Sequence, residues 1–135
     1  MTAIGDEAFI DCTGITNIII RDSVTYIGKK AFAYCHSLTS INIPDSVTYI
    51  GEEAFWECYS LVKCILPDSV TAIKANTFQS CNSLEHISIP DSVTIIEEDA
   101  FDGCDSLSVT YKGKTYKPDD IVSEFSRFAQ SKNHG

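Results

Sequence analysis

A repeat of 23 residues runs along the chain and limits its possible folds more than any other feature of the sequence. Five cysteines recur at this interval, and a phenylalanine stands three residues before each of them. The two rows are Cys12, Cys35, Cys58, Cys81 and Cys104, and Phe9, Phe32, Phe55, Phe78 and Phe101. A fixed period of this length is typical of solenoids, because one unit cannot bury its apolar residues alone and stacked units join like residues into continuous rows.

Each unit predicts a strand, a turn and a brief helical segment. In the second unit, residues 38–43 have the spacing L-x-x-I-x-I, whose last members alternate as in a strand that is buried on one face. Pro-Asp-Ser at 44–46 predicts a turn, because proline fixes φ and short polar side chains bond to their own backbone. A second extended piece is expected at 47–50. Apolar residues of 50–58 then recur at helix-like spacing, which predicts a short helix or helical turn.

The repeated segments L-x-x-I-x-I, P-D-S-V-T-x-I-G and A-F-x-x-C-x-S-L resemble the BspA-like leucine-rich repeats, from Ile4 to about Lys117. The resemblance implies a curved repeat solenoid of leucine-rich-repeat type, with short parallel strands on one face and short helical turns on the other. It also implies microbial proteins at the cell surface or secreted, which adhere to host or neighbouring-cell proteins, and it implies no catalytic residue. Residues 1–10 lack the features of a signal peptide.

One part of the familiar leucine-rich pattern is missing. Where that pattern has Asn or Cys after the strand, this chain has serine, at Ser46, Ser69 and Ser92. A row of serines is therefore expected in place of an asparagine ladder.

The front of the chain departs from the repeat. It enters in mid-unit at residues 1–4, without the polar cap that solenoid ends normally need, so we expect a fragment of a longer array. The apolar residues of this first, partial unit would lack a covering unit, which predicts a homo-oligomer through the exposed edge. These residues are Ile4, Phe9, Ile15, Ile18 and Ile20.

The back of the chain departs as well. Leu107, Val109 and Tyr111 are one residue short of the expected register, and Lys-Gly-Lys at 112–114 replaces Pro-Asp-Ser. After Pro118, apolar residues recur as one helical stripe, which predicts a capping helix and tail over 119–135 behind a solenoid of about five units over 1–118. The residues of the stripe are Ile121, Val122, Phe125, Phe128 and Ala129.

Charge and hydropathy narrow the class of partner. Ten basic and nineteen acidic residues give a net charge of -9, which argues against nucleic acid and anionic membranes as partners. No apolar run approaches the roughly 20 residues of a membrane helix, so no membrane insertion is expected.

Motifs for catalysis or metal binding are missing from the sequence. The cysteine row predicts buried free thiols rather than disulfides, and zinc is disfavoured because no C-x-x-C is present. An acidic row could suggest calcium, but it offers one carboxylate per unit; its members are Asp22, Asp45, Asp68 and Asp91. The three histidines stand in unrelated columns. We therefore expect no enzyme, no cofactor and no metal.

The candidate binding residues stand in columns that vary between units while the core columns stay fixed. They are Tyr26, Tyr49, Lys63, Ile65 and His86, in outward columns of the strands and in the column after Val-Thr. Such a variable strand face predicts a recognition or adhesion module for an extracellular or cell-surface protein or glycan. An ordinary role as partly buried sheet residues stays open, as does an alternative function as a structural spacer or self-assembly segment of a longer repeat protein. Tyr34, Trp56 and Tyr59 form a second candidate on the convex side, where solvated surface residues are the simpler interpretation.

Overall fold

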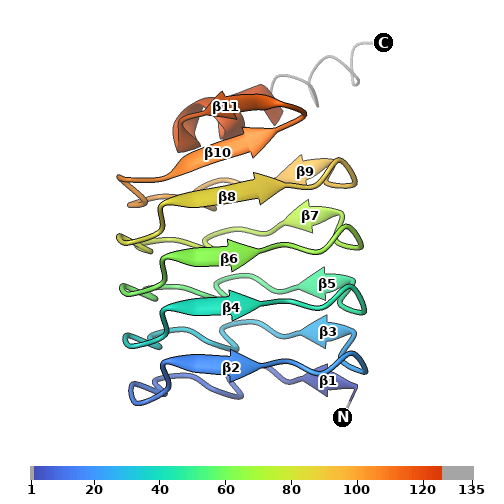
Figure 1. Cartoon of the computed structure of the whole chain (residues 1–135), viewed down its shortest axis with the longest axis vertical. Helices are drawn as coiled ribbons and strands as arrows, with labels where there is room; N and C mark the ends of the chain where they lie inside the picture. Colours follow the sequence, from blue (N-terminus) through green and yellow to red (C-terminus); the bar gives the residue numbers. More distant parts are fainter. Residues whose placement is uncertain (1, 126–135) are drawn as a thin grey trace.

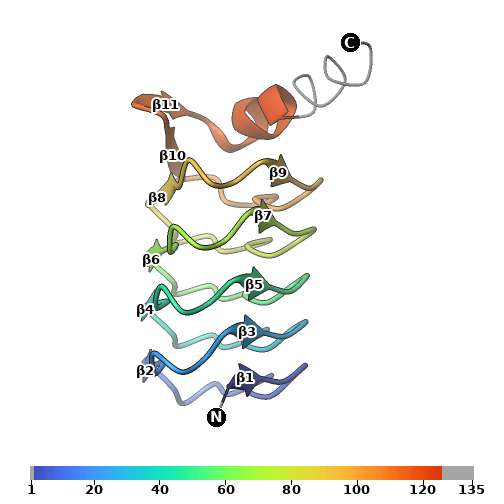
Figure 2. The ribbon, with the colours of Figure 1, turned by 90° about the vertical axis from the view of Figure 1, so that its right-hand side faces the viewer.

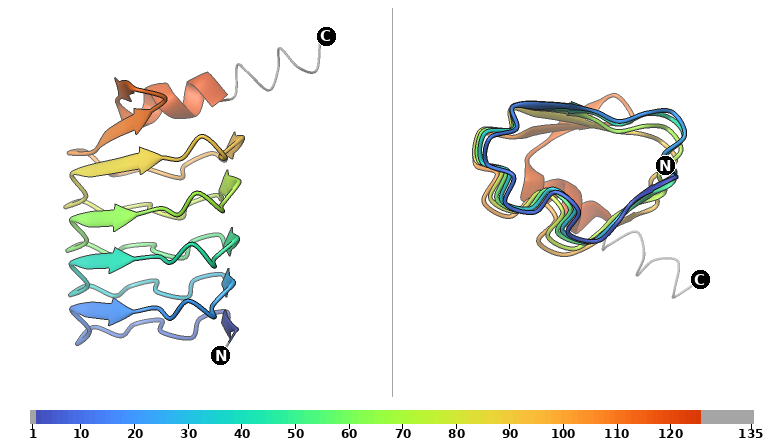
Figure 3. Two further views of the ribbon diagram at one scale, coloured as in Figure 1. Left: turned by 45° about the vertical axis from the view of Figure 1, so that its right-hand side comes forward. Right: turned by 90° about the horizontal axis from the view of Figure 1, so that it is seen from below.

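The chain winds into a coil whose turns, or rungs, repeat the 23-residue period of the sequence (Figure 1). The structure is a computed structural model, and it describes residues 2–125. Viewed along the stack, the rungs nearly superpose, so the curvature implied by the resemblance is slight over this length (Figure 3). The predicted repeat solenoid with parallel strands is confirmed.

One side of the coil is a six-stranded sheet in the order β11-β10-β8-β6-β4-β2. Its strands are β2 (Asn17–Ile19), β4 (Ser40–Asn42), β6 (Lys63–Ile65), β8 (His86–Ile89), β10 (Ser108–Tyr111) and β11 (Lys114–Tyr116). From β2 to β10 the pairing is parallel, and Ile41 lies opposite both Ile18 and Cys64. Cys64 therefore occupies the inward isoleucine position of its strand.

A second set of strands lies on another side of the coil (Figure 2). It forms a three-stranded sheet of β1 (Ala3–Ile4), β3 (Tyr26–Ile27) and β5 (Tyr49–Ile50), and a two-stranded sheet of β7 (Ala72–Ile73) and β9 (Ile95–Ile96). These strands confirm the second extended piece in each unit.

The gap between β5 and β7 coincides with a change of residue type. The column after these strands has Gly28 and Gly51 in the second and third rungs, and Lys74 in the next. A Cβ added at Gly51 would lie 2.6 Å from the backbone nitrogen of Lys29, closer than real contacts allow. Two rungs therefore approach closely at a glycine. The residue type alone does not explain the gap between β5 and β7, because Glu97 stands in the same column and β7 still pairs with β9.

The remaining side of each rung consists of successive β-turns, so the expectation of short helical turns is wrong. In the second rung the N–H groups of Ala31, Ala33 and Cys35 donate to carbonyls three residues earlier, at 3.2–3.3 Å. Between them, Lys30 and Tyr34 have φ of 56° and 63°, which is incompatible with the negative φ of an α-helix. Left-handed residues at equivalent positions interrupt every potential helix on this side, which we call the turn side.

The turn side carries its own ladder between rungs. Lys30, Phe32 and Tyr34 donate their N–H groups to the next rung, to the carbonyls of Glu52, Ala54 and Trp56, at 2.8–3.0 Å. Alternate residues thus bond within the rung and across it. This arrangement gives the backbone N–H and C=O groups hydrogen-bond partners without a helix.

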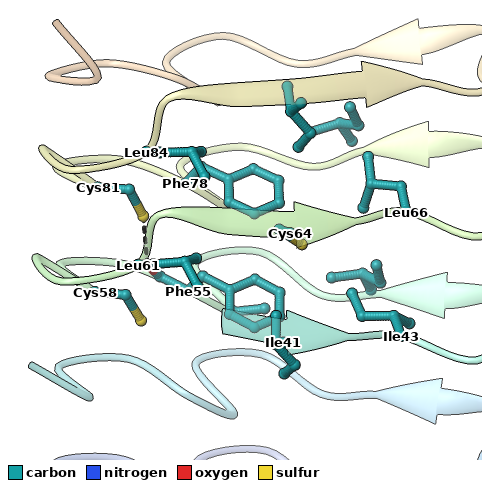
Figure 4. Packing of buried hydrophobic residues seen from close by; sticks show 14 of the residues in the cluster. Ile41, Ile43, Phe55, Cys58, Leu61, Cys64, Leu66, Phe78, Cys81 and Leu84 are labelled. Atoms are coloured by element: carbon teal, nitrogen blue, oxygen red, sulfur yellow. Dashed lines mark hydrogen bonds between the residues drawn. The ribbon is translucent and has the colours of Figure 1, made fainter. Parts of the chain in front are cut away.

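The core is a set of continuous rows inside the coil (Figure 4). The ring of Phe55 is fully buried and stacks on Phe32 and Phe78, with both centroid distances 5.4 Å. Leu61 and Leu84 are buried beside these rings. Each row joins like residues from consecutive rungs, which confirms the stacking that the period predicted.

The C-terminal end closes the stack. Val109 lies opposite Ile87, 22 residues away, so the register is one residue short as predicted. The chain then turns at Lys112 and Gly113 into β11, which pairs antiparallel with β10, a hairpin that the sequence did not predict.

A helix follows over residues 118–125. Ile121 is fully buried in the core, and the rings of Tyr111 and Phe125 lie 5.1 Å apart. The helix therefore caps the last rung with its apolar face, as predicted. Phe128 and Ala129 of the predicted stripe lie outside the described residues.

Candidate functional site

The outer face of the large sheet, the strand face, holds three of the candidate binding residues. Along β2, β4, β6 and β8, side chains alternate between the core and the outside. The inward positions are apolar in every rung, whereas the outward positions change from rung to rung. The outward residues of the strand face are Asn17, Ile19, Ser40, Asn42, Lys63, Ile65, His86 and Ser88.

Exposed apolar side chains lie among polar ones on this face. Ile19 is 87% exposed and Ile65 is 48% exposed, and Val62, just before β6, is 40% exposed. Lys63 lies opposite His86 in the sheet, and His86 Nε2 is 2.9 Å from Thr110 Oγ1. The structure therefore brings Lys63, Ile65 and His86 together on neighbouring strands.

A shallow groove of about 480 Å³ runs beside the strand face. It is lined by Asp22, Asp45 and Asp68 of the acidic row, and by Asn42 and Ile65 of the strand face. Among residues 2–125, no group of three or more His, Cys, Asp or Glu side chains lies close enough together to hold a metal ion. The acidic row therefore acts as a negatively charged border of the strand face.

The other two candidate residues, Tyr26 and Tyr49, lie in the second sheet, so the expectation of a single face for all five residues is wrong. Their rings stack at 4.9 Å with an interplanar angle of 4°, and Lys74 Nζ lies 5.7 Å from the centre of the Tyr49 ring. Loss of hydration, then the Asp6 carboxylate and Tyr49, raise the pKa of Tyr26. Both rings are a little over one third exposed and form a separate surface.

Large exposed side chains outside the candidate set show what the sequence reasoning missed. Ile19 stands in the same outward column as Ile65, and Ile95, 54% exposed, stands in the column of Tyr26 and Tyr49. Their columns were identifiable from the period, but their exposure depends on the neighbouring rung. Val62 lies in a variable column that follows the buried leucine row.

The cysteine row consists of free thiols with a specific contact. All six cysteines are free, and five of them are buried. The thiols of Cys35, Cys58, Cys81 and Cys104 each donate to the carbonyl of a phenylalanine in the preceding rung, at 3.0–3.2 Å. Figure 4 shows this bond between Cys81 and Phe55. The row is therefore a ladder of hydrogen bonds as well as a row of small apolar groups.

The environment of these thiols opposes ionisation. Burial raises the pKa of Cys35 to about 11 and that of Cys64 to about 12. For Cys81, the neighbouring thiol of Cys104 and burial both raise the pKa. A thiol is nucleophilic and binds metals only as the thiolate. The protonated thiols of the cysteine row therefore act as structural groups.

The serine row makes a second ladder. Ser69 Oγ donates to the carbonyl of Val47 at 2.5 Å, and Ser92 Oγ donates to that of Val70 at 2.7 Å. Ser46 Oγ is buried and has no hydrogen-bond partner among the described residues. The replacement of an asparagine ladder by serines is confirmed at Ser69 and Ser92.

Comparison with known proteins identifies the family. The family model described as "BspA type Leucine rich repeat region" matches residues 2–121 in six copies. The chain belongs to the BspA-type leucine-rich repeat family. A comparison with curated proteins gives no match.

Solved structures of bacterial repeat proteins support the assignment to the BspA-type family. A leucine-rich repeat protein from Bacteroides ovatus is 34% identical with a TM-score of 0.77, over 81% of this chain and 28% of its own. The T. pallidum leucine-rich repeat protein is 34% identical with a TM-score of 0.78, over 80% of this chain and 51% of its own. A leucine-rich cell surface protein from Faecalibacterium prausnitzii shares the fold at 23% identity, with a TM-score of 0.56, over 84% of this chain and 52% of its own.

The BspA-type chain thus spans about half or less of these relatives' lengths. Leucine-rich repeat proteins are generally non-catalytic scaffolds for binding, and the family indicates an interaction module built from repeats. Within residues 2–125, no helix has the length and apolar character needed to cross a membrane.

Proposed function

We propose that this BspA-type chain is a non-catalytic recognition or adhesion module, at the cell surface or secreted, that binds an extracellular protein or glycan through its strand face. The observation that carries the proposal is the division between fixed and varied positions on β4, β6 and β8. Ile41, Cys64 and Ile87 point inward and are buried, whereas the outward neighbours change in every rung. Stacking of the rungs explains why the inward residues are apolar in every rung, but it does not require the outward residues to vary.

The chemistry of the strand face supports contact with a partner. Ile65 and Val62 expose apolar surface next to the ammonium of Lys63, and exposed apolar groups with polar neighbours are common in interfaces. The acidic border at Asp45 and Asp68 favours a partner that presents positive or hydrogen-donating groups along that edge. Lys63, Ile65 and His86 are the proposed contacts. Tyr26 and Tyr49 would contact only a partner that also reaches the second sheet.

Two exposed isoleucines provide a matched test of the proposed surface. The chain is screened on arrays of purified extracellular proteins and glycans, and the affinity for each hit is then measured for Ile65→Asn and Ile95→Asn. Both residues are about half exposed, at 48% and 54%, but they lie in different sheets. We expect Ile65→Asn to weaken binding by about tenfold or more, as for an interface anchor, and Ile95→Asn to leave it unchanged. Loss in Ile95→Asn alone, or no hit on either array, would contradict the proposal.

A second candidate function, self-assembly, is supported by the front edge. Phe9, Ile15 and Ile18 are only half-buried, and a mainly apolar hollow of about 190 Å³ lies beside Ile4 and Ile18. Such a face can accept another rung, and a second copy of the chain can supply one. Sedimentation over a range of concentrations should show a dimer that Ile18→Arg abolishes, and a monomer at every concentration would reject this candidate.

A further inference from the structure

Four aromatic side chains gather on the turn side of the second and third rungs. They form the turn-side aromatic cluster, which consists of Tyr34, His36, Trp56 and Tyr59. Tyr34 and Trp56 have ring centroids 5.2 Å apart, and the rings of His36 and Tyr59 stack at 4.7 Å. Tyr34 and His36 meet edge to face at 6.3 Å, so the four rings form one continuous group.

Stacking of the rungs does not explain this group. None of the four rings belongs to the hydrophobic core or packs against it. His36 and Tyr59 are exposed, and Tyr34 and Trp56 are half-buried. One rung further on, the positions equivalent to Trp56 and Tyr59 hold Gln79 and Asn82. A rung of the same stack therefore exists without aromatic residues at these positions.

Carboxylates surround the cluster. Tyr59 Oη donates to Glu57 Oε1 at 2.9 Å. Loss of hydration, followed by the charges of Glu57, Asp11 and Glu53, raises the pKa of Tyr34, which places all three carboxylates near this ring. No described residue forms an ion pair with any of them. The cluster thus combines aromatic faces with negative charge that the described part of the chain does not neutralise.

A cation already lies against one of these rings. The Nζ atom of Lys30 is 5.8 Å from the centre of the Trp56 ring, within the range of a cation–π interaction. The Trp56 face is therefore accessible to a charged nitrogen.

We propose that the turn-side aromatic cluster is a second binding surface that takes arginine side chains of a basic protein segment. A guanidinium group stacks flat on aromatic rings and donates paired hydrogen bonds to carboxylates, which matches rings that lie beside Glu57 and Glu53. The net charge of -9 attracts such a segment from a distance. The site is independent of the strand face, so either surface can bind without the other.

The fluorescence of Trp56, the only tryptophan of the chain, reports directly on this site. The probe is a blocked glycine-serine peptide with spaced arginines, titrated at physiological ionic strength, and the control peptide carries neutral citrulline at the same positions. We expect a saturable fluorescence change with the arginine peptide alone. Tyr59→Ala and Glu57→Gln should each weaken binding about fivefold or more, and Tyr49→Ala in the second sheet should not weaken it.

Two neighbouring lysines supply a matched pair of variants. Lys30→Ala and Lys29→Ala remove the same charge, but only Lys30 lies over the Trp56 ring. Since the Lys30 ammonium competes for that face, Lys30→Ala should strengthen peptide binding more than Lys29→Ala does. Equal effects of the two variants would contradict competition at the ring and overturn the proposal.

Other outcomes also overturn the proposal that the turn-side aromatic cluster binds arginine. If the citrulline peptide binds as strongly as the arginine peptide, or if Tyr59→Ala and Glu57→Gln leave binding unchanged, the cluster does not recognise a cationic side chain. No saturable change with the arginine peptide would have the same meaning. If a neutral oligosaccharide from a glycan array changes the Trp56 fluorescence and the arginine peptide does not, the cluster is a glycan site instead.

Discussion

At the scale of single residues, the cysteine row shows how one side chain serves two purposes. The Cys58 thiol is fully buried and also donates to the carbonyl of Phe32 at 3.2 Å. An alanine would fill part of the space without the hydrogen bond, and a valine would lack the donor. This explains why the chain keeps cysteine at a position where any small apolar residue would satisfy burial alone.

The cysteines predict a loss of stability at alkaline pH. Folded Cys35 holds its proton to about pH 11, whereas its ordinary pKa is 9.0. Between these values the unfolded chain loses a proton that the folded chain keeps, so stability is full below pH 9 and falls as pH rises. The free energy of unfolding of Cys35→Ala, measured by denaturant unfolding, should therefore fall less steeply between pH 9 and 11 than that of the wild type.

The same variant has a cost at neutral pH. Cys35→Ala removes the bond to the carbonyl of Phe9 and should lower the free energy of unfolding by about 1 kcal/mol at pH 7. Cys12→Ala is the control, because the Cys12 thiol lies in the first rung and donates to no carbonyl among the described residues. Parallel curves for the wild type and Cys35→Ala above pH 9 would show that this thiol does not couple to folding.

Aromatic residues in the interior and on the surface should respond very differently to truncation. Phe55 is fully buried between two stacked rings, so Phe55→Ala should lower the free energy of unfolding by about 3–5 kcal/mol. Tyr49 is 38% exposed and stacks on one ring, so Tyr49→Ala should cost about 1 kcal/mol. Chemical denaturation measures both, and equal losses would contradict the assignment of Phe55 to the core.

The candidate residues show how far the sequence could identify a binding surface. The period separated fixed from varied columns, and it correctly marked Ile65 and His86 as outward. It could not place Tyr26 and Tyr49 in a different sheet, because one rung contains two extended segments and their relative direction depends on the turn between them. The contacts among Tyr34, Trp56 and Tyr59 likewise require the packing of two rungs.

At the scale of elements, the turn side shows why the helical prediction failed. Apolar spacing in residues 50–58 resembles that of a helix, but Glu53 and Glu57 have φ of 59° and 58°. Non-glycine residues rarely adopt this conformation, so the sequence gives no warning of it. Hydrogen bonds between stacked rungs stabilise this left-handed conformation. The sequence of a single unit does not reveal these bonds, because they depend on the neighbouring units.

The glycine column predicts where the second sheet is intolerant of a side chain. Gly51→Ala would place its Cβ 2.6 Å from the nitrogen of Lys29, and should lower the free energy of unfolding by about 1–3 kcal/mol. Gly5→Ala is the matched control in the same column, because a Cβ there meets no atom within 4 Å. Equal thermal midpoints for the two variants would contradict the close approach of the rungs at Gly51.

At the scale of the whole molecule, the proposed function assigns stability to the interior of the solenoid and recognition to its strand face. Almost every rung contributes similar residues to the interior rows, so the stack is held together by repetition. The outside of the large sheet carries a different set in each rung, and the acidic row forms a border beside it. A surface of this kind can change its specificity by substitution without a change of fold.

The measurement that tests this separation most directly uses a variant in which the strand face loses its three proposed contacts. Lys63→Ser and Ile65→Asn give the third rung the outward residues Ser40 and Asn42 of the second rung, and His86→Ser repeats Ser40 in the fourth rung. The affinity of this triple variant is measured for the array member that binds the wild type, beside the thermal midpoints of both proteins. We predict that binding is lost while the midpoint stays within a few degrees of the wild type. Retained affinity, or unfolding of the variant, would contradict the claim that the strand face serves recognition and not stability.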